Sequence, residues 1–296
     1  MKRLFTLLCV SACMLTAMAQ RQIQNPSFED WDNEGTTSVE PTHWNSFMSG
    51  TGSMKSFAAA QQVQKSDDAH SGNFSARIYA RSVFGVVAQG NLTTGCINMG
   101  SATATDANGN YNYTNEDDAD FHQKFTGLPD AMRVWVKGSC KYPAGASCNL
   151  HTTGYFQDPA GNTITATRIA KANTSEIACS SDWQEVIIPF VYDVTDGTRP
   201  AYALITLTTS GTPGQGNASD YMLVDDVEFL YYSDLRAVNF NGKDIPFTGT
   251  TVNIDGTYDE TLLQLKSGQG ATINSYYAEA SKTLTVSITG EDIAEN

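Results

Sequence analysis

The chain has few basic residues and few histidines, and it lacks the sequence motifs of several common enzyme classes. Its 18 lysines and arginines stand against 32 aspartates and glutamates, which gives a formal net charge of -14. A surface of this sign repels the phosphates of nucleic acids and of anionic lipids, so neither is expected as a partner. No P-loop, dinucleotide-binding fingerprint or Gly-x-Ser-x-Gly nucleophile motif is present.

Amphipathic helical patterns are absent, and the chain has a long apolar run only at its start. A basic start, an apolar run to residue 18 and the small-residue site Ala17-Met18-Ala19 predict a signal peptide over residues 1–19, too short to span a membrane. Cys13 stands in a lipoprotein-like context, but the apolar region before it is very short. The sequence therefore favours soluble export, to the periplasm, the outer-membrane surface or the extracellular space, over a lipid anchor at Cys13.

Short segments with alternating apolar and polar residues recur along the chain, separated by turns rich in Gly, Pro and Asn. The alternation is clear in YMLVDDVEFLYY (221–232), where two acids interrupt it. Such alternation predicts β-strands with one buried face. We therefore expect an all-β fold, with an antiparallel jelly-roll β-sandwich over residues 20–232. Residues 233–296 predict a small immunoglobulin-like β domain without a clear closing strand, either incomplete or completed by a strand from elsewhere.

The stretch from Met132 to Gln157 predicts a hairpin whose two faces differ in chemistry. With Cys140 opposite Cys148, the apolar residues fall on one face. Aromatic rings can stack on the C–H faces of sugars, and polar side chains can bind sugar hydroxyls. The alternative is that this face is covered by another segment or simply solvated. The predicted ligand-binding residues are those of the polar face: Arg133, Trp135, Lys137, His151, Thr153 and Tyr155.

Four cysteines remain after the predicted cleavage: Cys96, Cys140, Cys148 and Cys179. An even number in an exported protein predicts disulfides, with three possible connectivities. The hairpin register favours Cys140–Cys148, which leaves Cys96 to pair with Cys179. Their spacing matches no zinc site.

Seven stretches, in one order between residues 22 and 232, together resemble the carbohydrate metabolism domain family of exported gut-bacterial proteins. The resemblance implies a jelly-roll β-sandwich similar to non-catalytic carbohydrate-binding modules, often joined to an immunoglobulin-like domain. The chain departs from the family pattern at GSCKYPAGASC, where paired cysteines stand in place of an aromatic-rich strand. The stretches are NPSFEDW, EPTHWNSF, HSGNFSARI, AQGNLTTGCI, GLPDAMRVWVKGSCKYPAG, SSDWQEVIIPF and YMLVDDVEFLYY.

The same resemblance implies a structural calcium ion, because jelly-roll binding modules often hold one near their first and last strands. The matching positions are Glu29 and Asp226. Calcium takes oxygen ligands, so two carboxylates and backbone carbonyls would suit it. The alternative is that the acids of this strand make ordinary hydrogen bonds at a turn or a sheet edge.

Three functions are compatible with these features. The leading expectation is an exported, non-catalytic protein that binds or accompanies glycans, and the first alternative is a structural or adhesive surface protein whose partners are envelope proteins. The second alternative is a glycoside hydrolase, which requires two carboxylates about 5 to 10 Å apart. No pattern among the 32 acids marks such a pair.

Overall fold

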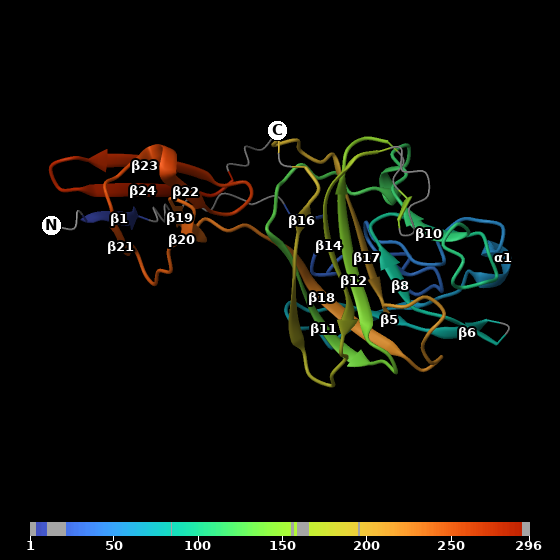
Figure 1. The fold of residues 1–296 in the computed structure, drawn as a ribbon. Helices are drawn as coiled ribbons and strands as arrows, with labels where there is room; N and C mark the ends of the chain where they lie inside the picture. Colours follow the sequence, from blue (N-terminus) through green and yellow to red (C-terminus); the bar gives the residue numbers. More distant parts are fainter. Residues whose placement is uncertain are drawn as a thin grey trace. The chain divides into compact units, whose positions relative to one another are not determined.

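The computed structural model describes residues 4–10, 22–83, 85–154, 157–158, 166–194 and 196–291 (Figure 1). The fold is all-β, as predicted, with almost every element a strand. The described chain forms two compact units. The larger contains residues 22–126 and 131–229, and the smaller contains β1 (Leu4–Val10), residues 127–130 and the described chain from Leu230 onward. Within the described residues, no helix has the length and apolar character needed to cross a lipid bilayer.

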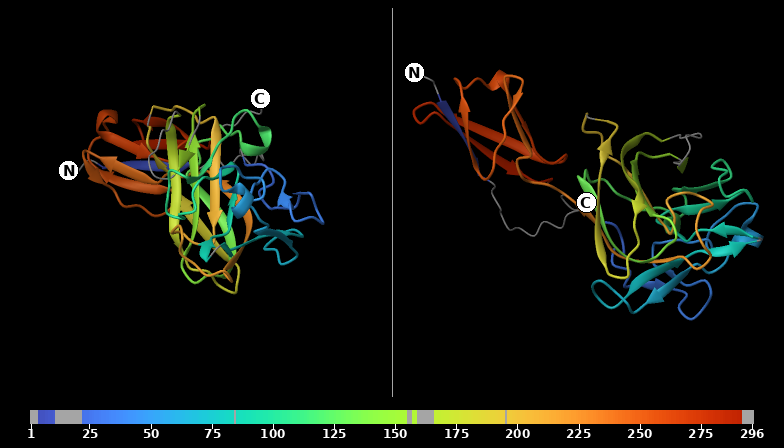
Figure 2. Two further views of the ribbon diagram at one scale, coloured as in Figure 1. Left: turned by 90° about the vertical axis from the view of Figure 1, so that its right-hand side faces the viewer. Right: turned by 60° about the horizontal axis from the view of Figure 1, so that its bottom comes forward.

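The larger unit is a jelly-roll β-sandwich built on two five-stranded sheets (Figures 1 and 2). The first sheet has the order β15 (Gln184–Pro189), β11 (Ala131–Ser139), β18 (Tyr221–Leu230), β5 (Ser75–Tyr79), β4 (Val63–Ser66). The second has the order β16 (Val191–Tyr192), β14 (Arg168–Ile177), β12 (Ala144–His151), β17 (Tyr202–Thr208), β8 (Asn91–Thr93).

Smaller elements surround the two sheets of this unit. A three-stranded sheet has the order β13 (Gln157–Asp158), β10 (Asn110–Tyr113), β9 (Cys96–Met99), and two short pairs are β2 (Trp31–Asp32) with β3 (Glu40–Pro41) and β6 (Arg81–Val83) with β7 (Val86–Ala88). The only helical turns described in this unit are α1 (Lys55–Ala58) and the 3-10 turn Ala119–Phe121.

The core of the sandwich consists of alternate residues from strands of both sheets. The alternation of β11 is visible in its burial, since Met132, Val134 and Val136 are 0% exposed while the residues between them are half-buried. Burying one such aliphatic side chain stabilises the fold by about 1.5 to 3 kcal/mol. Other fully buried contributors include Met222 and Val224 from β18, Cys148 and Leu150 from β12, and Ile205 and Leu207 from β17.

The predicted hairpin between Met132 and Gln157 is wrong, although the predicted faces of its strands are right. β11 pairs with β15 in the first sheet, where Trp135 lies opposite Glu185. β12 pairs with β14 and β17 in the second sheet, where Cys148 lies opposite Ala172 and Ile205. The turn therefore carries the chain from one sheet to the other. Alternation determines which side of a strand is buried, but a buried side can equally face a neighbouring sheet across the core.

β18 changes its neighbour at its two central acids. Up to Val224 the strand pairs with β5, whereas beyond the acids the backbone N–H of Val227 donates to Pro26 O at 2.9 Å. The buried positions shift phase by one residue here, and Asp226 has a φ of 44°. Both features are typical of a β-bulge, which keeps Val227 and Phe229 in the core.

The smaller unit packs two sheets around its own apolar cluster. One sheet has the order β20 (Lys243–Asp244), β19 (Ala237–Phe240), β22 (Leu263–Lys266), and the other has the order β21 (Thr251–Asp255), β1 (Leu4–Val10), β24 (Thr283–Thr289), β23 (Thr272–Ala278). A 3-10 turn spans Glu260–Leu262. Part of the predicted signal peptide thus forms a central strand of this sheet, while Cys13 lies outside the described residues. The cluster comprises Leu235, Val238, Phe240, Val252, Ile254, Leu284, Val286 and Ile288.

The cysteine positions do not support the predicted pairs. Cys148 is in the core and Cys96 is 1% exposed with its Sγ 3.7 Å from Thr51 Oγ1, whereas the Sγ atoms of Cys140 and Cys179 lie 2.9 Å apart. The backbone near these two is held together, because Gly138 N donates to Ser180 O at 2.7 Å. The contact with Cys140 lowers the pKa of the Cys179 thiol, which favours the thiolate that forms disulfides.

We therefore expect the oxidised protein to contain a Cys140–Cys179 disulfide and free thiols at Cys96 and Cys148. Peptide mapping by mass spectrometry, with and without reductant, checks this. Because the bond closes a loop with 39 residues of sequence separation, its reduction should destabilise the larger unit by about 2 to 4 kcal/mol. A linked Cys140–Cys148 peptide would restore the original expectation.

Candidate functional site

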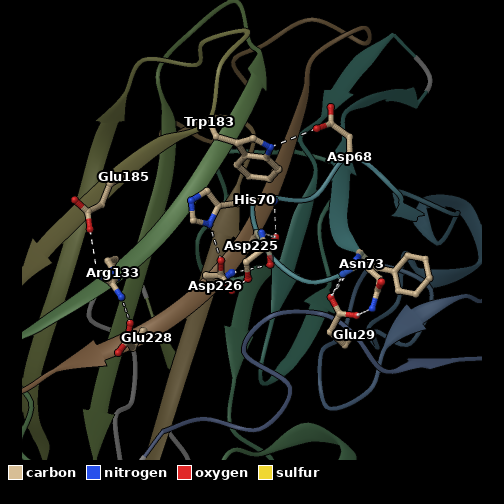
Figure 3. A network of polar contacts seen from close by, with 12 residues as sticks. Glu29, Asp68, His70, Asn73, Arg133, Trp183, Glu185, Asp225, Asp226 and Glu228 are labelled. Atoms are coloured by element: carbon tan, nitrogen blue, oxygen red, sulfur yellow. Dashed lines mark hydrogen bonds and ion pairs between the residues drawn. The ribbon is translucent and has the colours of Figure 1, made fainter.

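The outer face of the first sheet is covered by residues 67–74, which connect β4 to β5 and are called the covering loop below (Figure 3). The His70 ring stacks on Trp135 of β11, with 3.7 Å between ring centroids and 11° between planes. The ring of Trp183 meets the same histidine edge-on at 6.0 Å. The aromatic surface predicted to bind sugar is therefore already in contact with protein.

The two acids of β18 hold the covering loop in place. Asp225 is 0% exposed, and its Oδ2 accepts hydrogen bonds from the backbone N–H groups of His70 (2.8 Å) and Ser71 (3.2 Å). Its Oδ1 accepts from Asp226 N at 2.8 Å. Asp226 accepts from Ser71 Oγ at 2.9 Å and lies 2.7 Å from His70 Nδ1. Burial raises the pKa of Asp225 to about 6, although the amide donors of the loop favour its charged form.

The two cations of β11 are also bound to acids rather than free for a ligand. Lys137 Nζ donates to both carboxylate oxygens of Asp68 in the covering loop, at 2.9 and 2.7 Å. Arg133 pairs with Glu185 at 3.2 Å and also with Glu228 (Figure 3). The covered-face alternative therefore describes this surface.

Of the remaining predicted ligand residues, His151 ends β12 in the second sheet, Thr153 follows that strand, and the third is not described. His151 is 0% exposed, its Nε2 lies 2.8 Å from Thr114 Oγ1, and burial lowers its pKa to about 4, so the ring is neutral at pH 7. Thr153 is exposed. Tyr155 lies outside the described residues. Of the predicted site residues that the structure describes, Arg133, Trp135 and Lys137 thus belong to the first sheet, whereas His151 belongs to the second.

The two predicted calcium ligands bind hydrogen-bond donors instead of facing each other. Glu29 accepts from Asn73 N, Phe74 N and Asn73 Nδ2 at 2.8 to 3.1 Å, while Asp226 binds His70 and Ser71 (Figure 3). Burial acts to raise the pKa of Glu29, but these donors outweigh it and hold the pKa below its ordinary value. Donor hydrogens directed at both carboxylates do not fit a cation that needs oxygen ligands on all sides. Among the described residues, no cluster of three or more acids, histidines or cysteines is arranged to hold a metal.

A groove of about 500 Å³ lies against the outer face of the second sheet and is called the amide groove below. The strand register determines which residues form the floor of the groove. Ser147 of β12 lies opposite Asn173 of β14 on one side and Thr206 of β17 on the other. These residues alternate with the core residues of the same strands, so their side chains occupy the outer face.

Amides and hydroxyls are the main polar groups of this floor. Asn91 and Asn112 exchange two side-chain hydrogen bonds at 3.1 Å, and Asn112 also donates to Thr206 Oγ1 at 2.9 Å. The side chains of Ser147 and Asn173 make no hydrogen bond with the rest of the described chain. Asn173 is exposed and Ser147 half-buried, so both are available to a ligand.

Apolar side chains line other parts of the amide groove. Phe57 of α1 is 55% exposed and Val86 of β7 is 42% exposed, and Tyr111 of β10 adds a second aromatic ring. Among the described residues that line the groove, Lys171 is the only charged one, and none is Asp, Glu or His. An apolar surface beside neutral donors and acceptors matches a ligand with C–H faces and many hydroxyls.

Sequence reasoning did not find the amide groove because its residues come from strands whose pairing was unknown. A partial signal was present, since Ser147 and Thr206 each stand between buried apolar residues, whereas Asn173 has such a neighbour on one side only. Only the order β14-β12-β17 places them in one row. Phe57 and Val86 carry no signal of their own, because isolated exposed apolar residues are common.

Comparison with known proteins finds solved structures that are similar to this chain and identifies no family for it. No family model and no curated protein matches the chain. Three solved structures are among those similar to the chain. A provisionally assigned glycoside hydrolase from Bacteroides thetaiotaomicron aligns over 72% of both chains with 16% identity and a TM-score of 0.53. Another from Bacteroides vulgatus aligns over 69% of this chain and 96% of its own, with 14% identity and a TM-score of 0.48.

The third is a carbohydrate-binding module specific for non-crystalline cellulose, which aligns over 57% of this chain and 79% of its own, with 12% identity and a TM-score of 0.28. Of the three, the first has a TM-score above 0.5, and at 16% identity it shows a shared fold alone.

We expect Asp225→Ala to release the covering loop and lower the free energy of unfolding by about 2 to 3 kcal/mol, because three backbone donors lose a buried acceptor. The raised pKa means that Asp225 contributes most when protonated and that its contribution falls as pH rises through about 6. The free energy of unfolding that Asp225→Ala removes should therefore be larger at pH 5 than at pH 8, as measured by denaturant titration. Asp67→Ala, which removes an exposed acid of the same loop, should change stability by less than about 0.5 kcal/mol.

Calcium should not stabilise the protein, because Glu29 and Asp226 are bound to donors in the folded state. Melting temperatures measured with millimolar calcium and with EDTA should agree. A rise with calcium that EDTA reverses, and that Glu29→Gln abolishes, would contradict this arrangement of donors.

Proposed function

We propose that the protein is an exported glycan-binding protein and that the amide groove is its ligand site. The observation that carries the proposal is the lining of the groove, where exposed Phe57 and Val86 accompany the unbound side chains of Ser147 and Asn173. A sugar ring presents one apolar face and a rim of hydroxyls, so it can stack and hydrogen-bond in one pose. The fold shared with carbohydrate-related proteins supports the same direction.

The chemistry of the lining favours binding over hydrolysis. A glycoside hydrolase requires a carboxylic acid and a second carboxylate on either side of the bond that is cut. The chain has 32 acids, yet none of them is among the described residues that line the groove. A neutral glycan, rather than an acidic or basic one, fits a lining with Lys171 as its charged member.

Export remains part of the proposal and follows from the leader pattern of residues 1–19. The structural or adhesive alternative has separate support in the smaller unit, where one strand comes from this leader. That feature concerns a surface outside the larger unit's groove, so the two functions can be tested independently.

A glycan array with residues 20–296, followed by calorimetry on any positive, tests the amide groove. Phe57→Ala should weaken binding about tenfold through lost stacking and burial, and Asn173→Ala should weaken it several-fold through lost hydrogen bonds. Ile187→Ala removes another exposed aliphatic residue, from β15 in the first sheet, and should leave affinity unchanged.

Trp135→Ala is the control that separates the two candidate faces. It lies under the covering loop, so its loss should lower stability and leave glycan affinity intact at temperatures where the variant is folded. Binding that Trp135→Ala abolishes, while Phe57→Ala and Asn173→Ala retain it, would overturn the proposed site. Silence across the array for the unmodified protein would count against glycan recognition by this chain.

A further inference from the structure

The smaller unit depends on a strand that comes from the leader. β1 lies between β21 and β24, antiparallel to the first and parallel to the second. Among the described strands, β21 pairs with β1 alone. Without β1, therefore, the sheet is divided in its middle, and the backbone groups of β21 and one edge of β24 lose their partners. We call this position, between residues 251–255 and 283–289, the strand slot.

The register defines the chemistry that the strand slot accepts. Leu7 lies opposite Val252 on one side and Leu284 on the other, Phe5 lies opposite Ile254, and Cys9 lies opposite Val286. The four partners belong to the core of the unit and are at most 5% exposed. Cross-strand partners share one face of a sheet, so alternate residues of the inserted strand must be apolar. Between them, Thr6 lies opposite Asn253 and Thr283, a polar row that tolerates a polar residue.

Export removes the strand that fills the slot. Cleavage after Ala19 and lipoprotein processing at Cys13 both separate residues 4–10 from the rest of the chain. The new start of the chain cannot return to the slot after cleavage at Ala19, because Gln22 exchanges two hydrogen bonds with the backbone of Phe229 and Gln24 N donates to Gln123 Oε1 in the larger unit. Too few residues precede them to form a strand of this length.

We propose that in the exported protein the strand slot accepts an extended, seven-residue strand from a partner envelope protein, apolar at its second, fourth and sixth positions. The strand runs antiparallel to β21 and parallel to β24, as β1 does. Main-chain hydrogen bonds on both sides supply affinity, and the alternate apolar side chains supply specificity, as in other cases of β-strand addition. An open edge of this kind otherwise favours aggregation, which gives the partner a second role in keeping the protein soluble.

Hydrogen exchange on residues 20–296, with a peptide of Arg3–Ser11 carrying Cys9→Ala as the probe, tests the proposal. The peptide should slow amide exchange in residues 251–255 and 283–289 at least tenfold and leave β12 and β17 unchanged. A peptide that also carries Phe5→Asp and Leu7→Asp should have no effect, because charge would enter the apolar row. Slow amide exchange in the strands of the larger unit serves as the control that the protein is folded.

The unprocessed chain, residues 1–296 made without export, supplies the matched comparison. It should protect residues 251–255 without any peptide, and Leu7→Pro should remove that protection because proline lacks the N–H and breaks the ladder. A smaller unit that is unfolded in residues 20–296 and folds when the peptide is added supports the proposal equally well.

Four results would overturn the inference. The first is that residues 251–255 are as well protected in 20–296 alone as in the full chain. The second is that the peptide fails to slow exchange, and the third is that protection accompanies a dimer in which a second copy fills the slot. N-terminal sequencing that finds residues 4–10 retained after export would do the same. None of these results bears on glycan binding, which is read from the amide groove of the larger unit.

Discussion

The apposition of two inner sheet faces is the constraint on which the larger unit depends. Met132, Val134 and Val136 of β11 face the core from one sheet, and Cys148 and Leu150 of β12 face it from the other. Because alternate residues point outward on each strand, burying these positions determines which residues form the outer face of each sheet. One is sealed by the covering loop and its stacked His70–Trp135 pair, and the other carries the amide groove.

The acids that bind loops give this unusually acidic chain much of its local order. Asp225 and Glu29 accept the backbone amides of the covering loop, Asp220 accepts Lys141 N and Asn217 N, and Asp130 in the smaller unit accepts Tyr232 N and Gln269 N. Hydrogen bonds from amides to carboxylates are stronger than those between neutral groups, so short loops can be held without helices or metals. The amide groove, by contrast, is lined by neutral amides and hydroxyls, which suits recognition of a neutral ligand.

Local pattern predicted the elements well and their neighbours poorly. The alternation in YMLVDDVEFLYY identified β18, and the change of apolar phase at Asp225–Asp226 is explained by the bulge where the strand exchanges β5 for the N-terminal segment. The two faces of β11 and β12 were also predicted correctly, yet the hairpin was not. A turn of the same length can close a hairpin within a sheet or cross between sheets, and residue alternation is identical in both cases. The expected Cys140–Cys148 pair and the expected joint ligand face of β11 and β12 were both inferred from that hairpin.

The sequence by itself determined the all-β class and the buried side of β11 and of β18. Those properties follow from the two-residue alternation of apolar and polar residues, from composition and from turn residues, all of which can be recognised within a few consecutive positions. Tertiary structure alone decided which strands are neighbours, and hence that Ser147, Asn173 and Thr206 form one row, that Cys140 meets Cys179, and that Leu4–Val10 lies between β21 and β24. Contacts between residues far apart in the chain depend on the packing of whole sheets, and no local pattern encodes them.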